Sequence, residues 1–250
     1  MDPGLVWDSL PRMLHGTLET LWITALSVAI GLALALPLAL MRVSRHPLLR
    51  WPVYGYIFYF RGTPLLIQIY LLYYGSAQFR GTLEAIGLWT FFVNNYFCAV
   101  LALTLNTAAY TAEILRGAIE AVPHGEVEAA RACGMSGALL YRRIILPKAF
   151  RLALPAYANE VVFLFQATSL VSIITIMDLT GVARAIAARS FAIYEIYIAA
   201  GLVYLAITYG ILWAFGQIEF RWSAHLRARP RAAAARLVPG EDAATPLLRP

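Results

Sequence analysis

The stretch of sequence that decides how this chain folds is residues 128–147, which read EAARACGMSGALLYRRIILP. Acidic residues lie in the first turn of a predicted helix over 126–133, where the helix dipole favours them, and Gly134 can end that helix in a left-handed conformation. Ser136 can cap a second helix, and Pro147 is expected to break or kink the chain before the next apolar segment. The stretch therefore predicts two short helices joined at a glycine.

Small side chains give this loop a shallow face. Ala129 and Ala130 would let a partner approach closely, and Glu128 would present a charge to a basic group on it. The residue types alone still favour an ordinary solvated helical hairpin.

The composition is that of a membrane protein. Hydrophobic residues make up 60% of the chain, charged residues 14%, and the mean hydropathy is +0.66, whereas a soluble domain carries about 25% charged residues. The net charge of +6 comes almost entirely from arginines. Because these cluster between apolar segments, they indicate membrane topology and not nucleic-acid binding.

Five segments are long and apolar enough to cross a bilayer, which takes about 20 residues. They cover approximately residues 17–40, 52–74, 91–115, 152–177 and 194–215. The predicted fold is therefore an all-α polytopic membrane protein. We expect residues 1–16 to be an external segment, 17–220 a transmembrane domain with a loop at 120–150, and 221–250 a disordered cytoplasmic tail.

The distribution of positive charge predicts the orientation. The segments that follow the first, third and fifth spans are rich in arginine, and the other connections hold only Arg12, Arg80, Arg184 and Arg189. This bias places the N-terminus outside and the C-terminus in the cytoplasm. Asp2 and Asp8 precede the first span where a signal peptide would be basic, so that span is expected to remain in place.

The chain has no recognisable ATP site, catalytic group or metal site. A P-loop needs Gly-x4-Gly-Lys-Ser/Thr, and the one lysine, Lys148, follows Pro147. The four histidines and two cysteines stand at no metal-ligand spacing. We expect no cofactor in this chain.

Glu160 lies within a predicted span, where an ionised carboxylate costs a few kcal/mol unless it is paired or wet. A cationic substrate group could supply the partner. The alternative is a hydrogen bond to Asn159 or to a neighbouring span.

Arg61 also lies within a span and is followed by Gly62 and Pro64. That combination interrupts helical hydrogen bonding. A membrane protein tolerates such an interruption only where the backbone contacts other protein or water. Arg61 could meet a substrate carboxylate or pair with Glu113 or Glu160, while Glu113 could instead pair with Arg116.

Further polar residues complete a candidate substrate pathway. Gln166, Thr168 and Ser169 follow Glu160 on the same span, although interhelical hydrogen bonds suit them better than ligand contacts. The full set is Glu160, Asn159, Arg61, Thr63, Gln166, Thr168 and Ser169.

The spacing E-A-A-x3-G-x9-I-x-L-P over 128–147 resembles the coupling loop of bacterial ABC-importer permeases. Residues 60–65 (FRGTPL), 106–114 (NTAAYTAEI), 116–119 (RGAI) and 154–160 (LPAYANE) are similar to the polar amino-acid permeases of histidine, arginine and opine importers. The similarity covers about residues 15–222 and is closest to the "M" permeases of the histidine/lysine/arginine/ornithine and octopine systems. Once this resemblance is considered, a loop that docks a partner is favoured over a solvated helical hairpin.

The resemblance implies an importer in the bacterial inner membrane, with two permease subunits, two ATPases that carry ATP and Mg, and a periplasmic amino-acid-binding protein. A heterodimer with a second related permease is favoured over self-pairing. The implied ATPase-coupling residues are Glu128, Ala129, Ala130, Gly134, Ile144, Leu146 and Pro147.

The resemblance also implies a polar, basic substrate: histidine, arginine, lysine, ornithine or an opine. Ala167 stands near the position where some arginine importers of the family carry an acid, which argues against a two-carboxylate site. The alternatives are a permease for a neutral or acidic polar amino acid and an ion-coupled secondary carrier. A secondary carrier commonly has internal repeats, and none is visible.

Overall fold

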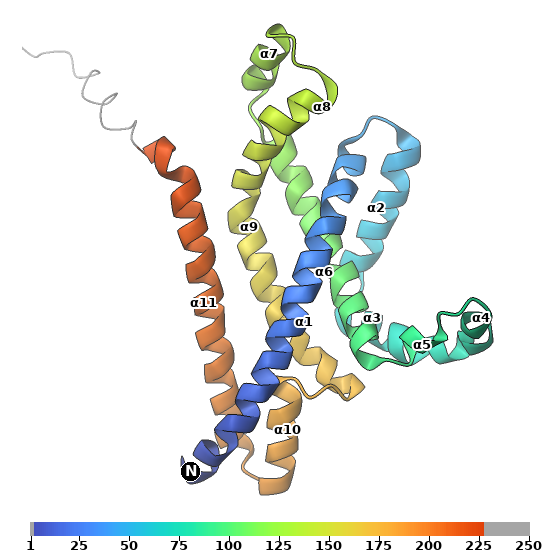
Figure 1. The fold of residues 1–250 in the computed structure, drawn as a ribbon, viewed down its shortest axis with the longest axis vertical. Coiled ribbons are helices and arrows are strands. Elements are labelled where there is room, and N and C mark those ends of the chain that lie inside the picture. Colours follow the sequence, from blue (N-terminus) through green and yellow to red (C-terminus); the bar gives the residue numbers. More distant parts are fainter. Residues whose placement is uncertain (1–2, 228–250) are drawn as a thin grey trace, which may run out of the picture.

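The computed structural model describes residues 3–227, and its regular elements are all helical (Figure 1). The longer helices are α1 (Pro3–Val43), α2 (Pro47–Gly62), α3 (Leu65–Tyr73), α6 (Asn95–Glu120), α9 (Leu146–Ala167), α10 (Leu179–Ser190) and α11 (Ile193–Arg227). Shorter elements are η1 (Gly75–Phe79), α4 (Arg80–Ala85), α5 (Trp89–Phe92), α7 (His124–Ala132), α8 (Gly137–Leu140), η2 (Tyr141–Ile145) and η3 (Thr168–Ile174). The predicted all-α polytopic fold is confirmed.

Within the described residues, 4 helical stretches are long and apolar enough to cross a membrane: Gly4–Val43, Asn95–Glu120, Gly137–Ile174 and Ile193–Trp222. The predicted span over 52–74 is interrupted at Gly62–Pro64, as its sequence indicates, and forms two separate helices, α2 and α3. Residues 3–16 are helical and continue directly into the first span. The predicted disordered tail lies outside the described residues from position 228 onward.

The helices pack around α6. It lies against α1, α2, α3 and α9, while α11 packs on the outer side of α9 and α10 fits between α1 and α11. Figure 1 shows the α1–α2 turn, the α7–α8 loop and the end of α11 at one end of the molecule, with the N-terminus and α10 at the other. The two arginine-rich connections, the α1–α2 turn and the α7–α8 loop, therefore lie at the end where α11 finishes.

Small residues let α1 and α6 approach closely. A Cβ added at Gly31 of α1 would lie 2.4 Å from Cγ2 of Thr107 on α6, and Ala102, Ala108 and Ala109 of α6 are completely buried. In a membrane, where apolar burial between helices gains little, such close packing is a main source of helix association.

Side-chain amides satisfy the backbone carbonyls at the break between α2 and α3. Pro64 has no N–H to donate, so the carbonyl of Phe60 loses its helical partner. The buried Gln68 donates from Nε2 to the Phe60 carbonyl at 2.9 Å and to the Thr63 carbonyl at 3.1 Å. Asn106 of α6 donates to the same Phe60 carbonyl at 3.3 Å and to Oε1 of Gln68 at 3.0 Å. The break thus has few unsatisfied groups and is tied to α6.

Replacing Gln68 with leucine should destabilise the protein. The change removes the side-chain donor to the Thr63 carbonyl and leaves the Phe60 carbonyl with Asn106 alone, and an unsatisfied buried group costs about 1–3 kcal/mol. The thermal unfolding midpoint in detergent measures the effect. Gln166→Leu is the matched control because Gln166 is exposed, and equal midpoints for the two variants would refute the role of Gln68.

Asp178 fixes the other end of the bundle. Its buried carboxylate accepts hydrogen bonds from the backbone N–H of Thr180 at 3.2 Å and of Gly181 at 2.9 Å, which caps α10. The hydroxyl of Tyr204 on α11 donates to it at 3.5 Å, and Thr20 of α1 accepts from the N–H of Leu179. Burial raises the pKa of Asp178 from 3.8 to about 6.

This raised pKa predicts a pH dependence of stability. The folded chain holds a proton on Asp178 over the range from about 4 to 6 where the unfolded chain does not, so this residue makes folding less favourable as the pH rises through that window. Asp178→Asn keeps a capping side chain and should remove that dependence, whereas Asp178→Ala should cost about 1 kcal/mol for the lost cap. Unfolding midpoints at pH 4.5 and 7 distinguish them, and an unchanged pH profile in Asp178→Asn would contradict the assignment.

Candidate functional site

A cavity of about 600 Å³ opens beside the α2–α3 break. It lies among the end of α2, the start of α3, and the facing sides of α6 and α9. Its lining residues are Arg61, Gly62, Thr63, Pro64, Leu65, Asn106, Tyr110, Glu160, Phe163, Leu164 and Ala167. The cavity therefore combines one carboxylate and one guanidinium with aromatic and aliphatic walls.

Glu160 is the acidic group of this cavity. Its side chain is buried, with 8% of the residue exposed, and Oε1 accepts a hydrogen bond from the Thr107 hydroxyl at 3.0 Å. In the described part of the chain it has no ion pair. A buried carboxylate with a single hydroxyl partner retains free acceptor capacity, which suits a cationic ligand.

Arg61 and Thr63 line the same cavity. The Arg61 guanidinium lies over the Tyr110 ring, 5.1 Å from its centroid, and it makes no ion pair with Glu113 or Glu160. The hydroxyl of Thr63 donates to the Tyr59 carbonyl at 2.8 Å. Arg61 is exposed, so its donors are open to a ligand carboxylate.

The other predicted pathway residues do not line this cavity. Asn159 and Gln166 are exposed outside it. Thr168 is buried and donates to the Phe165 carbonyl at 2.6 Å, and the Ser169 carbonyl accepts from Ser172 at 3.0 Å.

Two cavity residues, and one residue that contacts Glu160 from outside the lining, were missed by reasoning from charged groups alone. Thr107 contacts Glu160, while Asn106 and Tyr110 lie four residues apart and line the cavity from one face of α6. The signal was available, because polar residues recur at helical spacing within an otherwise apolar segment.

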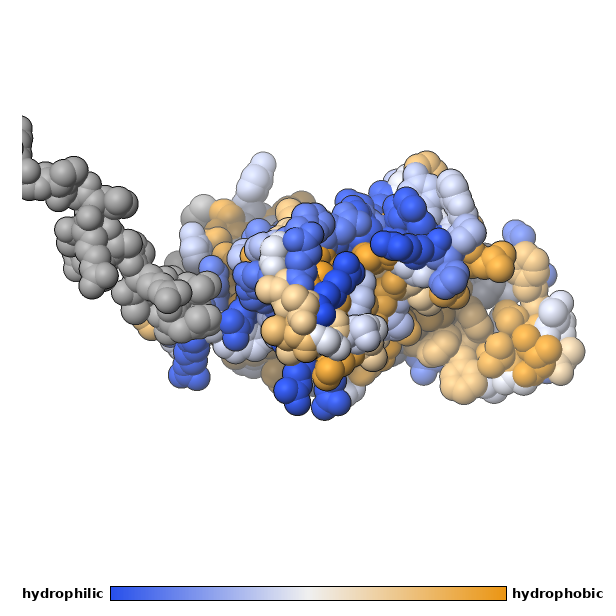
Figure 2. Space-filling model, turned by 90° about the horizontal axis from the view of Figure 1, so that it is seen from above, coloured by the Kyte–Doolittle hydropathy of each residue, from blue (hydrophilic) through white to orange (hydrophobic). Residues whose placement is uncertain are grey.

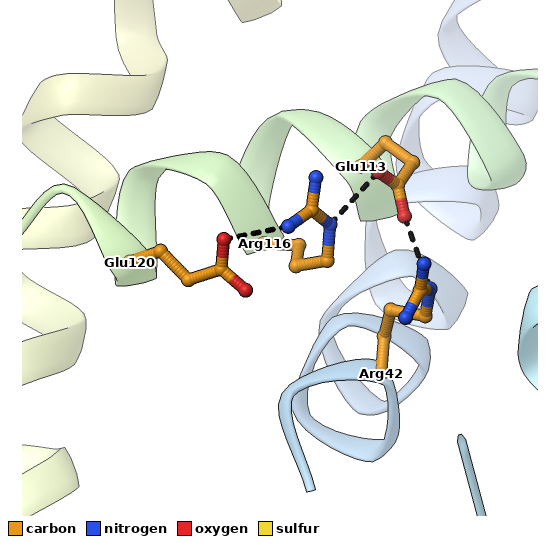
Figure 3. Close-up of polar contacts among 4 residues, drawn as sticks. All are labelled: Arg42, Glu113, Arg116 and Glu120. Carbon is orange, nitrogen blue, oxygen red and sulfur yellow. Dashed lines mark hydrogen bonds and ion pairs between the residues drawn. The ribbon is translucent and has the colours of Figure 1, made fainter.

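An ion-pair network lies farther along α6, towards the α7–α8 end (Figure 3). The Glu113 carboxylate is 2.8 Å from Nε of Arg116 and 3.4 Å from Nε of Arg42 on α1, and Arg116 also pairs with Glu120 at 2.6 Å. The alternative that paired Glu113 with Arg116 is confirmed. A second cavity of about 430 Å³ is lined by Glu113 and Arg42 and shares Arg61 and Tyr110 with the first.

The loop at residues 120–150 folds as two short helices around a glycine. Gly134 has φ +80° and ends α7, and the N–H of Met135 donates back to the Ala130 carbonyl at 3.0 Å. Ser136 precedes α8 with an extended backbone, although its side chain makes no capping bond.

The structure is irregular just before Pro147, where the chain forms the π-helical turn η2. Pro147 itself lies in the first turn of α9, and the helical stretch as a whole runs from Gly137 to Ile174.

A groove of about 470 Å³ runs across this loop. Ala129, Ala130, Ile144 and Pro147 line it, and Lys148 forms an ion pair with Glu126 beside it. The remaining candidates lie around the groove: Glu128 and Gly134 are exposed, and Leu146 packs into the core. Seen from this end in Figure 2, the surface carries many hydrophilic residues interspersed with hydrophobic ones.

The loop is packed into the same hydrophobic cluster as the transmembrane helices. Ala130, Leu140 and Ile145 belong to a buried cluster with Ala39 of α1 and Ile57 of α2. No group of three or more potential metal ligands occurs within residues 3–227.

Comparisons with known proteins agree with this arrangement. The chain is 47% identical over 229 residues to the nopaline transport system permease protein NocM of Agrobacterium fabrum, covering 92% of this chain and 95% of the relative. It is 45% identical over 228 residues to the histidine/lysine/arginine/ornithine transport system permease protein HisM of Escherichia coli, covering 89% and 93%. A solved structure of an amino acid ABC transporter with histidines superposes with a TM-score of 0.79 at 33% identity, covering 88% of this chain and 99% of that one.

The sequence matches the family described as "Binding-protein-dependent transport system inner membrane component" over residues 27–224. This match spans most of the chain, and the relatives above extend over nearly all of it. The chain is a permease that belongs to the family of binding-protein-dependent transport system inner membrane components.

Proposed function

We propose that this chain is the membrane subunit of an ATP-driven importer that moves a basic amino acid or an opine across the bacterial inner membrane. The observation that carries the proposal is the buried Glu160 carboxylate, which faces a cavity of about 600 Å³ and has only the Thr107 hydroxyl as a partner among the described residues. The names of the relatives NocM and HisM, which refer to nopaline and to basic amino acids, support the same substrate class.

In this proposal the substrate binds by its two oppositely charged ends. A guanidinium or ammonium group would pair with Glu160, and a carboxylate would meet the open donors of Arg61. The aromatic rings of Tyr110 and Phe163 would line the path between them. Displacing water around the cation strengthens its attraction to Glu160.

Glu160→Gln should reduce uptake of arginine and histidine at least about tenfold, which corresponds to losing about 1.4 kcal/mol of binding. Glutamine uptake should fall less, because a neutral side chain gains little from the carboxylate. Uptake of labelled arginine, histidine, octopine and glutamine in cells lacking the natural chain measures this.

Glu84→Gln is the matched control, because Glu84 pairs with Arg80 on the exposed α4, and it should transport normally. Equal losses for cationic and neutral substrates in Glu160→Gln would assign Glu160 a structural role. Restored uptake of glutamine alone by the natural chain would discard the basic substrate while keeping the importer.

A separate ATPase is proposed to dock on the α7–α8 loop. The chain lacks a P-loop, so another subunit would have to bind ATP. The groove lined by Ala129, Ala130, Ile144 and Pro147 is shallow enough for a partner to bind there. Two ATPases, a second related permease or a second copy, and a periplasmic binding protein would complete the complex. The charge bias supports placing the loop end in the cytoplasm, with the N-terminus outside.

Gly134→Val should uncouple transport from ATP hydrolysis. A β-branched residue is strained at φ +80°, at a cost of about 1–2 kcal/mol, so the turn that positions α7 against α8 would shift. We expect at least about a tenfold loss of ATP-driven uptake in proteoliposomes, with the chain still inserted in the membrane.

Gly125→Val is the control for this variant. Gly125 lies in the same loop, has open space around its Cβ position and no positive φ, so its uptake should stay near that of the natural chain. Normal uptake by Gly134→Val would rule out the proposed coupling role of this turn.

One observation favours a second candidate substrate class. Among residues 3–227 Arg61 forms no ion pair, and both it and Ala167 line the cavity. A neutral or acidic polar amino acid would use Arg61 more than Glu160. The uptake series above separates this candidate from the basic substrates.

A further inference from the structure

A groove of about 420 Å³ lies between the first turns of α1 and helix α10, at the end of the molecule opposite the α7–α8 loop (Figure 1). Its walls are mostly apolar and include Met177, Val182 and Ile186. Three basic side chains also line it: Arg12 and His15 from α1, and Arg189 from α10. Neither the substrate cavity nor the loop groove shares a residue with it.

The basic side chains of this groove are available to a ligand. All three residues are exposed, and within residues 3–227 none of them forms an ion pair with a carboxylate. Asp8 precedes Arg12 by one helical turn without pairing to it. The two guanidinium groups attract an anion, and the His15 imidazole can donate a hydrogen bond to it.

The groove lies at the level of the lipid headgroups. Residues 20–41 of α1 carry no charged side chain, and a helix of that length spans about 30 Å, the thickness of the hydrocarbon core. Arg12 and His15 lie roughly one to two turns beyond Thr20, or about 7–12 Å outside that core.

Exposed aromatic residues lie close in the chain to the basic residues of the groove: Trp7 precedes Arg12, and Phe191 and Tyr194 follow Arg189. Trp7 is 75% exposed, Phe191 88% and Tyr194 79%. Such rings are enriched where a membrane protein passes from hydrocarbon to headgroups. This surface suits a lipid better than a soluble protein, because a protein interface usually has a polar rim around its apolar centre.

We propose that the groove binds an anionic phospholipid, with the phosphate held by Arg12, His15 and Arg189 and an acyl chain lying along Val182 and Ile186. Guanidinium groups bind phosphate oxygens by charge-assisted hydrogen bonds, and the apolar wall accepts a chain that a soluble anion lacks. Because the lipid would contact both α1 and α10, it would fasten α10 against the first helix.

The test places a reporter beside the groove in the full importer complex. Ala188→Cys, in a chain that also carries Cys133→Ser, is labelled with a fluorophore. Ala188 is exposed next to Arg189 without lining the groove. The complex is reconstituted in phosphatidylcholine with added phosphatidylglycerol or phosphatidylcholine whose acyl chains are brominated, so that a bound lipid quenches the fluorescence.

Brominated phosphatidylglycerol should quench at a roughly tenfold lower mole fraction than brominated phosphatidylcholine, given three basic groups near the phosphate. The double variant Arg12→Gln/Arg189→Gln should abolish that preference. Arg45→Gln/Arg50→Gln is the matched control, because it removes two exposed arginines from the α1–α2 turn and the start of α2, and it should keep the preference. Soluble glycerol phosphate should not relieve the quenching.

Three results would overturn the proposal. Equal quenching by the two lipids would show that the groove does not select an anionic headgroup. Relief by glycerol phosphate would assign the site to a soluble phosphate ester. Absence of quenching, together with cross-linking of Ala188→Cys to another subunit, would show that a protein partner covers the groove.

Discussion

The architecture of this protein depends on one requirement: every buried backbone carbonyl must accept a hydrogen bond. In a bilayer no water can supply the donor, and the break at Pro64 frees a carbonyl at Phe60. The amides of Gln68 and Asn106 satisfy it from α3 and α6. Because these bonds keep α2 and α3 apart and tied to α6, the chain turns away at this point and leaves the cavity that Arg61 and Thr63 line. The cavity is thus a consequence of how the break is satisfied.

Close packing of α1 on α6 determines the chemistry on the other side of the cavity. Gly31 leaves no room for a side chain beside Thr107, so Thr107 is held where its hydroxyl meets Glu160. Farther along the same pair of helices, Arg42 of α1 reaches Glu113 of α6. One helix pair therefore positions both the cavity carboxylate and the ion-pair network towards the loop end.

The sequence allowed the all-α fold, the glycine-centred loop and the interruption near Pro64 to be predicted, because each follows from local rules of hydropathy or backbone geometry. It could not predict which groups satisfy the backbone at that interruption, since this depends on Gln68 and Asn106 meeting across elements. Nor could it choose a partner for Arg61, whose guanidinium pairs with neither Glu113 nor Glu160 and lies over the Tyr110 ring. Side chains that meet between distant segments are not encoded in local spacing.

Helix α9 connects the two candidate sites directly. It begins at Leu146, in the loop that lines the docking groove, and carries Glu160 roughly 20 Å farther along its axis. The loop itself is packed against α1 and α2 in one hydrophobic cluster. In the proposed importer, a displacement of the loop by an ATPase would move α9 and its carboxylate relative to Thr107 on α6. Such a movement could break the single hydrogen bond between Glu160 and Thr107, because a hydrogen bond to a charged group contributes only about 1.5–3 kcal/mol. Substrate release would then follow from moving one charge away from the cavity wall.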